Sequence, residues 1–218
     1  MFETDWILWT PETLRIPLKF EKWNTEKVEV STDALQATGT MGPVLSGSTT
    51  LFTTSIVDRC TLKINVRRFD ERMRNVWGNS GIQFGLVFGD TDVNNSRWLY
   101  KNAWCLSTGG DEGNGTSLWC RGKLTETKKR QIRKGSELQM TIDCKKKTVQ
   151  FAIDQVPFPP IKMDVTDLQI KQLRAAVTIY GESEIEMSEE WIGWTERPKR
   201  GICFFHVIQL AFYLLIFI

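Results

Sequence analysis

Histidine is almost absent from this 218-residue chain, whose one histidine, His206, lies in an apolar run near the C-terminus. Nucleophilic catalysis by a Ser–His or Cys–His pair needs a base that titrates near neutral pH, and the body of the chain offers no histidine for that role. A zinc site is disfavoured too, because the four cysteines of the body are scattered and include no CxxC pair. We therefore predict a protein that is not an enzyme and that needs no metal and no cofactor.

The N-terminus lacks a secretory signal, because Glu3 and Asp5 stand where such a signal needs positive charge and no apolar run follows them. The total of five cysteines is odd, which argues against a disulfide framework, and four of the five fall within expected strands. Both features favour reduced, buried thiols. We predict a body that faces the cytosol.

A strong net charge is also lacking, since 28 basic and 26 acidic residues leave a formal charge of +2. That value is too small to predict a nucleic-acid partner. The charges are nevertheless unevenly spread: residues 121–147 include ten basic and three acidic side chains, whereas residues 182–196 include six glutamates and no lysine or arginine. We interpret these stretches as two solvated faces of opposite sign.

Sustained helical periodicity is missing from the body of the chain. Short runs rich in β-branched and aromatic residues alternate instead with Gly, Asn, Asp and Pro, a pattern typical of all-β proteins. We predict a two-sheet antiparallel β-sandwich with one short helix at residues 164–172. The expected strands span residues 60–69, 82–88, 103–107, 117–121, 138–143, 149–154, 174–180 and 184–187, with weaker candidates at 27–31 and 35–39.

Apolar residues recur at every second position in the clearest strands, so they should face one side of a sheet. Residues 138–154 read as a hairpin with one buried face and an exposed tip at Lys145, Lys146 and Lys147. The predicted core consists of the apolar members of these alternating runs: Ile82, Phe84, Leu86, Met140, Ile142, Phe151, Ile153 and Val177.

Three segments of the chain resemble SPRY domains. The run SGIQFGLVF at residues 80–88 is similar to the glycine-punctuated strand of that family, residues 135–155 resemble its hallmark hairpin, and LRAAVTI at residues 173–179 resembles the strand that follows. The resemblance covers residues 27–191, with the best match at 81–187. It implies a concanavalin-A-like β-sandwich that binds proteins and does not catalyse a reaction.

Two positions depart from the family pattern. Asp154 and Gln155 stand where the family usually has Asn-Gly, and Ala175 stands where it usually has Pro. The first departure puts the type of the turn after Phe151 in question, and the second makes the entry to the next strand less rigid.

The resemblance also implies where a partner binds. SPRY domains that capture short peptides use the loop before the glycine strand and the turn after the last long strand, which correspond here to Trp77, Gly78, Asn79, Ser80, Ile179, Tyr180 and Gly181. An aromatic side chain beside exposed backbone groups is a suitable peptide anchor. Plain packing at the rim of the sandwich is the alternative for Trp77 and Tyr180.

Alternation of antiparallel strands sorts the loops into two ends. We expect residues 70–80, 109–116, the Lys145 tip and 181–183 at one end, and residues 89–102, 122–137 and 155–172 at the other. The second end would then carry a rival surface for an acidic partner or a nucleic-acid backbone, formed by Arg97, Trp98, Tyr100, Lys128, Lys129 and Arg130. A lectin-like, carbohydrate-binding sandwich is the alternative function from another class.

The C-terminal run GICFFHVIQLAFYLLIFI, residues 201–218, has no formal charge and follows the basic flank 197–200. As a helix rising ~1.5 Å per residue it would match a thin bilayer, and the flank would keep the preceding domain, residues 1–196, in the cytosol. We predict a tail anchor in an intracellular membrane, and a tail docked on the domain or a misassigned coding end remain open. The membrane-facing residues would be Ile202, Phe204, Phe205, Val207, Leu210, Phe212, Leu214 and Leu215.

Overall fold

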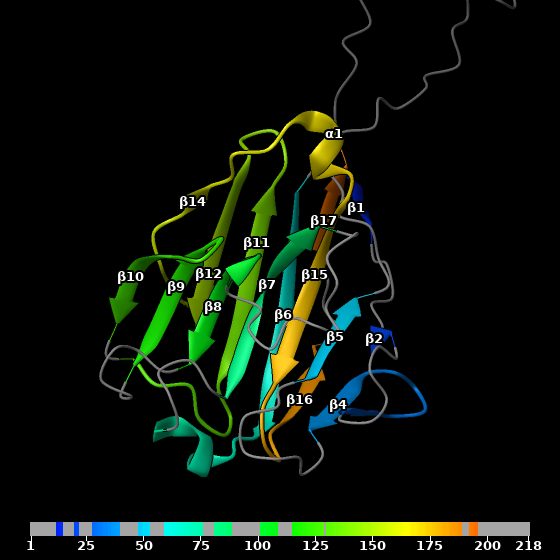
Figure 1. Ribbon diagram of the computed structural model, residues 1–218. Coiled ribbons are helices and arrows are strands. Elements are labelled where there is room, and N and C mark those ends of the chain that lie inside the picture. The colour runs from blue at the N-terminus through cyan, green and yellow to red at the C-terminus, as the bar shows by residue number, and fades with distance from the viewer. Residues whose placement is uncertain are drawn as a thin grey trace, which may run out of the picture.

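The computed structural model describes ten segments of the chain: residues 12–14, 20–21, 28–39, 48–52, 59–75, 81–88, 101–108, 115–128, 130–188 and 192–195. Strands dominate these segments and form two antiparallel sheets (Figure 1). The predicted all-β, two-sheet architecture is confirmed. Every strand expected from the sequence is present, with ends that differ by at most one residue.

The larger sheet has ten strands. Its main path runs β13 (Val156–Pro157), β12 (Thr148–Ile153), β11 (Glu137–Asp143), β6 (Arg59–Arg68), β16 (Glu184–Met187), β4 (Gln36–Gly39) and β3 (Val28–Val30). Three further strands join its sides: β14 (Ile161–Lys162) pairs with β12, β17 (Ile192–Thr195) pairs with β6, and β1 (Glu12–Leu14) pairs with β17. The central pair β6–β11 brings together segments that are far apart in the sequence.

The smaller sheet has seven strands. They run in the order β10 (Lys123–Lys128), β9 (Thr116–Cys120), β8 (Trp104–Thr108), β7 (Ile82–Phe88), β15 (Leu173–Ile179), β5 (Ser48–Phe52) and β2 (Phe20–Glu21). The glycine-punctuated strand β7 and the long strand β15 are neighbours at the centre, in a register that pairs Ile82 with Ile179. This register brings the start of β7 and the end of β15 to the same end of the sandwich.

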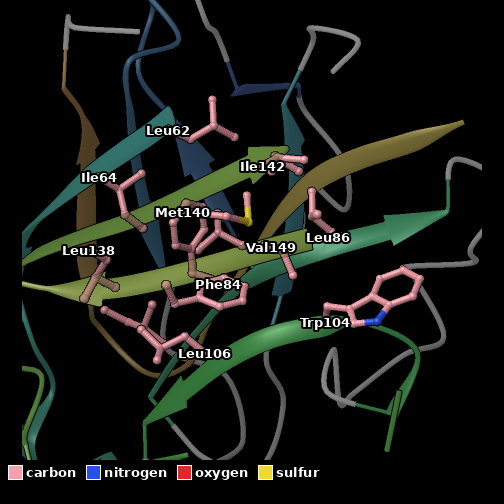
Figure 2. Packing of buried hydrophobic residues seen from close by; sticks show 14 of the residues in the cluster. Leu62, Ile64, Phe84, Leu86, Trp104, Leu106, Leu138, Met140, Ile142 and Val149 are labelled. Atoms are coloured by element: carbon pink, nitrogen blue, oxygen red, sulfur yellow. The ribbon is translucent and has the colours of Figure 1, made fainter. Parts of the chain in front are cut away.

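The core lies between the two sheets and follows the period-2 pattern of the sequence. All eight predicted core residues are fully buried, with exposed fractions of 0%. Figure 2 shows side chains of β7 and β8 turned toward those of β6, β11 and β12. Phe84 and Phe151 meet across the interior edge to face, with ring centroids 6.4 Å apart. The hydrophobic alternation therefore fixes which face of each strand is buried.

Two short helices accompany the sheets. The 3-10 helix η1 (Glu71–Asn75) follows β6, and α1 (Asp167–Ile170) lies within the segment where one helix was predicted. The helix α1 begins with a capping box in which Thr166 and Gln169 each accept a hydrogen bond from the other's backbone N–H. Ile170 turns inward from α1, while Leu168 is 76% exposed.

Seven strands were not predicted from the sequence, namely β1, β2, β5, β10, β13, β14 and β17, and the omission of β10 reversed the placement of the two loops that follow it. The strand β10 pairs with β9 through a two-residue turn at Arg121 and Gly122, both of which have positive φ as a type I′ hairpin requires. Residues 122–137 were expected to be a single loop. Because they contain this extra strand, every loop from β10 to the β11–β12 hairpin lies at the end opposite to the one predicted.

The sandwich thus has two distinct ends, which we name by their side chains. The aspartate end holds the segment after β6, the start of β7 and the turn after β15, around Asp70. The lysine end, at the top of Figure 1, holds the hairpin tip 144–147, since Asp143 of β11 pairs with Arg59 at the start of β6. The prediction that the Lys145 tip shares an end with residues 181–183 was wrong.

The turn that departs from the family pattern keeps the geometry of Asn-Gly. Asp154 and Gln155 have φ of 48° and 66°, and Ile153 pairs with Val156 across them, so the loop has two residues. The Asp154 carboxylate accepts a hydrogen bond from the Glu137 N–H at 2.9 Å. This bond gives Asp154 a local partner in a conformation that usually favours asparagine or glycine.

Four cysteines lie within the described segments and all are free thiols. Cys60 and Cys105 are buried in strands, and burial raises the pKa of the Cys105 thiol, which keeps it protonated. Cys120 is half-buried in β9, whereas Cys144 lies in the hairpin turn and not in a strand as predicted.

The predicted membrane-facing residues, from Ile202 to Leu215, lie outside the described residues. Among the residues that the structure describes, no helix combines the length and the apolar character needed to cross a bilayer.

Candidate functional site at the aspartate end

The candidate partner-binding site is organised around one buried carboxylate, that of Asp70, just after β6. Its Oδ1 accepts hydrogen bonds from the Arg72 N–H at 3.1 Å and from Arg72 Nε at 2.8 Å. Its Oδ2 accepts from Arg72 Nη2 at 2.8 Å and from the Glu182 N–H at 3.1 Å. The Asp70 N–H in turn donates to Ser183 Oγ at 3.0 Å. One aspartate therefore joins the segment after β6 to the turn between β15 and β16.

These donors favour the ionised carboxylate. The hydrogen bonds from the Arg72 side chain lower the pKa of Asp70 below its ordinary value, and burial of the side chain opposes them only in part. The Arg72 guanidinium, held against Asp70, has a raised pKa in return. Both groups stay charged near neutral pH, so the link between the two segments persists there.

The turn that Asp70 holds requires glycine at residue 181. Gly181 has φ of +62°, and a Cβ built on it would overlap Asp70 Oδ2 and press on Met73. Gly39 at the end of β4 is equally close, because a Cβ there would overlap the Gly181 carbonyl oxygen. The turn is thus packed against three segments of backbone and side chain at once.

The start of β7 is tied to the same turn. The Tyr180 N–H donates to the Gly81 carbonyl at 2.7 Å, and the Ile82 N–H donates to Thr108 Oγ1 at 2.9 Å. Residues 76–80 connect η1 to Gly81, so both of their attachment points lie at this end. Trp77, Gly78, Asn79 and Ser80 themselves lie outside the described residues.

The structure gives different surroundings to the three predicted site residues that it describes. Ile179 and Tyr180 are each 1% exposed, so their side chains belong to the interior, and packing at the rim is what the structure shows for Tyr180. Gly181 is partly exposed and offers backbone groups. Tyr180 is therefore positioned to shape the turn from below, and its ring is not an exposed anchor in this structure.

Charged side chains form the accessible part of the described aspartate end. Arg72 is 63% and Glu182 37% exposed at the side chain, and their charged groups approach to 3.4 Å. Arg68 Nε donates to the Glu182 carbonyl at 2.6 Å, and Arg67 pairs with Glu186. Sequence reasoning did not single out Asp70 or Arg72. The available signal was an aspartate with an arginine two residues later at a strand end, which is common in turns.

The structure describes only part of the rival surface that was predicted for the other end. Arg130 lies at the aspartate end, where its carbonyl accepts a hydrogen bond from Thr116 Oγ1 and its guanidinium is 3.5 Å from Asp154. Residues 89–100, which include Arg97, Trp98 and Tyr100, lie outside the described residues, but they follow β7 at the lysine end. What the structure does show is that Lys128 and Arg130 lie at the aspartate end, opposite to the end predicted for the loop 122–137.

A shallow groove lies on the outer face of the larger sheet. It has a volume of about 450 Å³ and is lined by side chains and backbone of Lys63, Gln139, Thr141, Gln150, Phe151, Ala152, Gln155 and Pro157. The Phe151 ring is buried in the core, so the groove offers amides, a hydroxyl and one ammonium group without an exposed aromatic face among its lining residues.

No protein-family model matches the sequence, and no curated protein matches it. Among solved structures the fold is similar to the TRIM65 PSpry domain, with 11% identity and a TM-score of 0.56 over 79% of this chain and 92% of that one. It is also similar to the SPRY domain of human HERC1, with 17% identity and a TM-score of 0.51 over 77% of this chain and 96% of that one. The Drosophila melanogaster neuralized NHR1 domain matches with 14% identity and a TM-score of 0.51 over 80% and 99% of the two chains. The chain therefore has a SPRY-like fold, as its motifs predicted.

Proposed function

We propose that this chain is a non-catalytic interaction module that binds a peptide or protein partner at the aspartate end. The observation that carries the proposal is the Asp70 link between the segment after β6 and the turn at Gly181. Loops that bind partners need a rigid support, and buried charge-assisted hydrogen bonds provide it. A SPRY-like fold is consistent with this role, since the resemblance implies protein binding.

Trp77, Gly78, Asn79 and Ser80 complete the proposed site, together with the backbone of Gly181. An aromatic anchor supplies much of the binding free energy at an interface, while exposed backbone amides fix the register of an extended peptide. Tyr180 and Ile179 contribute from beneath by holding the turn in place.

Peptide selection from a displayed library, followed by titration calorimetry with the full chain, tests this proposal. Trp77→Ala should reduce the binding free energy of the selected peptide by about 1 to 3 kcal/mol, the usual range for an anchor residue. Arg97→Ala, in the segment that follows β7 at the lysine end, is the control and should change the affinity little. If Arg97→Ala had the larger effect, the partner would bind at the lysine end instead.

We also propose that residues 201–218 tether the domain to an intracellular membrane, with the domain facing the cytosol. The support is sequence alone: the run is free of formal charge and has basic residues only on its N-terminal side. Resistance of the full chain to carbonate extraction is the expected result. Leu210→Arg with Leu214→Arg should abolish that resistance, because each charge costs about 2.5 kcal/mol or more near the centre of a membrane helix.

Carbohydrate binding remains the alternative from another class, and the groove on the larger sheet is its best described location. Amide and hydroxyl groups can hydrogen-bond a sugar, but stacking on an exposed aromatic ring is missing from the residues that line it. A glycan array tests this alternative. Carbohydrate binding would be favoured over peptide binding if the chain bound a glycan, if Gln139→Ala removed that binding, and if Trp77→Ala left it unchanged.

A further inference from the structure

Basic side chains gather at the lysine end of the sandwich from several segments. The cluster consists of Arg59, Lys145, Lys146, Lys147, Lys162 and Lys171. Strand pairing brings the first five together, because Arg59 pairs with Asp143 beside the hairpin tip and Lys162 pairs with Thr148 just after it. The Met163 N–H donates to the Lys147 carbonyl at 2.7 Å, and Lys171 caps α1 nearby.

Acidic groups only partly compensate this cluster within the described residues. Three carboxylates accompany the six basic groups: Asp143 is 3.8 Å from Lys146 Nζ, Asp167 is 2.9 Å from Lys147 Nζ, and Asp164 is exposed. Within the described residues, the lysine end therefore carries an excess of positive charge. At the opposite end two arginines, one at the end of β6 and one in η1, have acidic partners, since Arg67 pairs with Glu186 and Arg72 with Asp70.

An exposed apolar side chain projects beside these lysines. Leu168 on α1 is 76% exposed, whereas Ile170 of the same helix is buried. Most exposed leucines on a monomer need no explanation, but this one lies next to Asp167, the partner of Lys147, and Lys171 follows it three residues later. Apolar and basic groups side by side are the combination that binds the interface of an anionic bilayer.

The same end is where the described chain finishes. Trp194 of β17 pairs with Arg59, so β17 runs toward the lysine end and Thr195 is its last residue. The sequence then continues with Arg197, Lys199 and Arg200 before the charge-free run 201–218. The last described strand, β17, therefore ends at the lysine end of the sandwich and not at the aspartate end.

We infer that the lysine end lies against an anionic lipid surface, with Leu168 at the headgroup level and the aspartate end directed away from the membrane. This inference rests on the tethering part of the proposed function and adds the lipid class and the orientation. Phosphatidylserine-type headgroups attract nearby basic residues by about fivefold per residue, an effect that salt screens within about 10 Å. Such an orientation leaves the peptide site open to the cytosol.

The experiment compares the full chain on vesicles of phosphatidylcholine alone and of phosphatidylcholine with phosphatidylserine. Mass spectrometry follows acetylation of lysines by an amine reagent that does not cross the bilayer. Lys145, Lys146 and Lys162 should react several-fold more slowly when phosphatidylserine is present, and high salt should restore their rates. Lys134, exposed in the loop before β11 at the aspartate end, is the internal control and should react equally on both vesicles.

Equal rates for Lys145, Lys146 and Lys162 on the two vesicle types would overturn the inference. Carbonate extraction of the same samples reports on the tail separately, so a failed tether and a failed lysine surface give different results. A carbonate-resistant chain with equal rates keeps the tether and rejects the orientation. A carbonate-sensitive chain whose lysines are still protected by phosphatidylserine rejects the tether and keeps the lipid surface.

A further experiment measures lipid binding by the lysine end without a contribution from the tail, and it compares two double charge reversals. In the Leu210→Arg, Leu214→Arg background, flotation should show binding to vesicles with phosphatidylserine only. Lys145→Glu with Lys146→Glu should lower that binding by about tenfold or more, whereas Arg133→Glu with Lys134→Glu, the same charge change at the other end, should alter it by less than about twofold. If both pairs had the same effect, or if only binding of a duplex oligonucleotide responded to the first pair, the lipid surface would be wrong.

Discussion

The two ends of the sandwich use charge in different ways. At the aspartate end, Asp70 is buried and joins Glu182, 112 residues away, through a backbone hydrogen bond. At the lysine end the ion pairs of the hairpin tip are exposed, as between Lys146 and Asp143 and between Lys147 and Asp167. A buried, satisfied charge fixes the shape of a turn, whereas exposed, unbalanced charge shapes the electric field around it. The first arrangement suits a shape-specific partner and the second a charged surface.

Replacing the glycine at the aspartate end should give the largest effect. Gly181→Ala should lower the free energy of unfolding by about 2 to 4 kcal/mol, because it adds strain at positive φ and overlap with Asp70. Gly135→Ala is the matched control, since Gly135 also has positive φ but has open space where a Cβ would lie. Urea denaturation measures both. Equal losses would show that the Asp70 contact adds nothing to the strain.

Acid should weaken the aspartate end selectively. The pKa of Asp70 lies below its ordinary 3.8 in the folded protein, so its bonds stabilise the fold fully above that value and are lost as pH falls below it. The difference in unfolding free energy between wild type and Asp70→Asn should be about 1 to 3 kcal/mol at neutral pH and should shrink below about pH 4. Denaturation at several pH values tests this, and a difference that grows in acid would contradict it.

Ion pairs at the two ends should differ in their contribution to stability. Arg72→Ala removes two side-chain hydrogen bonds to a buried carboxylate and should lower the melting temperature, though by less than Gly181→Ala. Its backbone N–H bond to Asp70 Oδ1 can survive the substitution. Lys146→Ala removes a pair that is 3.8 Å apart and 76% exposed at the lysine, so the melting temperature should hardly change. If both variants shifted the melting temperature by a similar amount, the ion pairs at the two ends would not differ in their contribution to stability.

The smallest expected effect is a gain in the stability of the fold. Lys147 has φ of 53° in the hairpin tip, a conformation that costs a lysine about 1 kcal/mol more than a glycine. Lys147→Gly should therefore stabilise the fold by up to about 1 kcal/mol, reduced by loss of the exposed pair with Asp167. Lys147→Ala, which keeps the strain and loses the same pair, is the control and should not stabilise.

The central strands and the core were predictable from the sequence because period-2 alternation reports which face of a strand is buried. Met140 and Ile142 on β11 and Phe151 and Ile153 on β12 are buried as their alternation indicates. The strand β10 was not predictable in the same way. Its sequence, KLTETK, is polar on an edge of the smaller sheet, and its turn at Arg121-Gly122 lacks the Asn or Asp that usually marks a type I′ hairpin.

The candidate site was predictable only in part. The resemblance to SPRY domains directed attention to residues 179–181, and the structure places them beside Gly81. Asp70 and Arg72 were missed because their importance comes from a partner, Glu182, that local sequence does not reveal. Tyr180 looked like an exposed anchor because aromatic residues at strand ends can face either way, and its burial, at 1% exposed, is decided by the tertiary structure.

The sequence by itself determined the fold class, the buried face of each strong strand, and the apolar, charge-free character of residues 201–218. These properties follow from composition and periodicity, which act along a single strand. Only the tertiary structure decided which loops share an end, because one additional strand, β10, reverses the placement of the loop before β11 and of the β11–β12 hairpin tip. It also decided that Asp70 holds the Gly181 turn and that the lysine tip lies where β17 ends, since both depend on segments more than fifty residues apart meeting across paired strands.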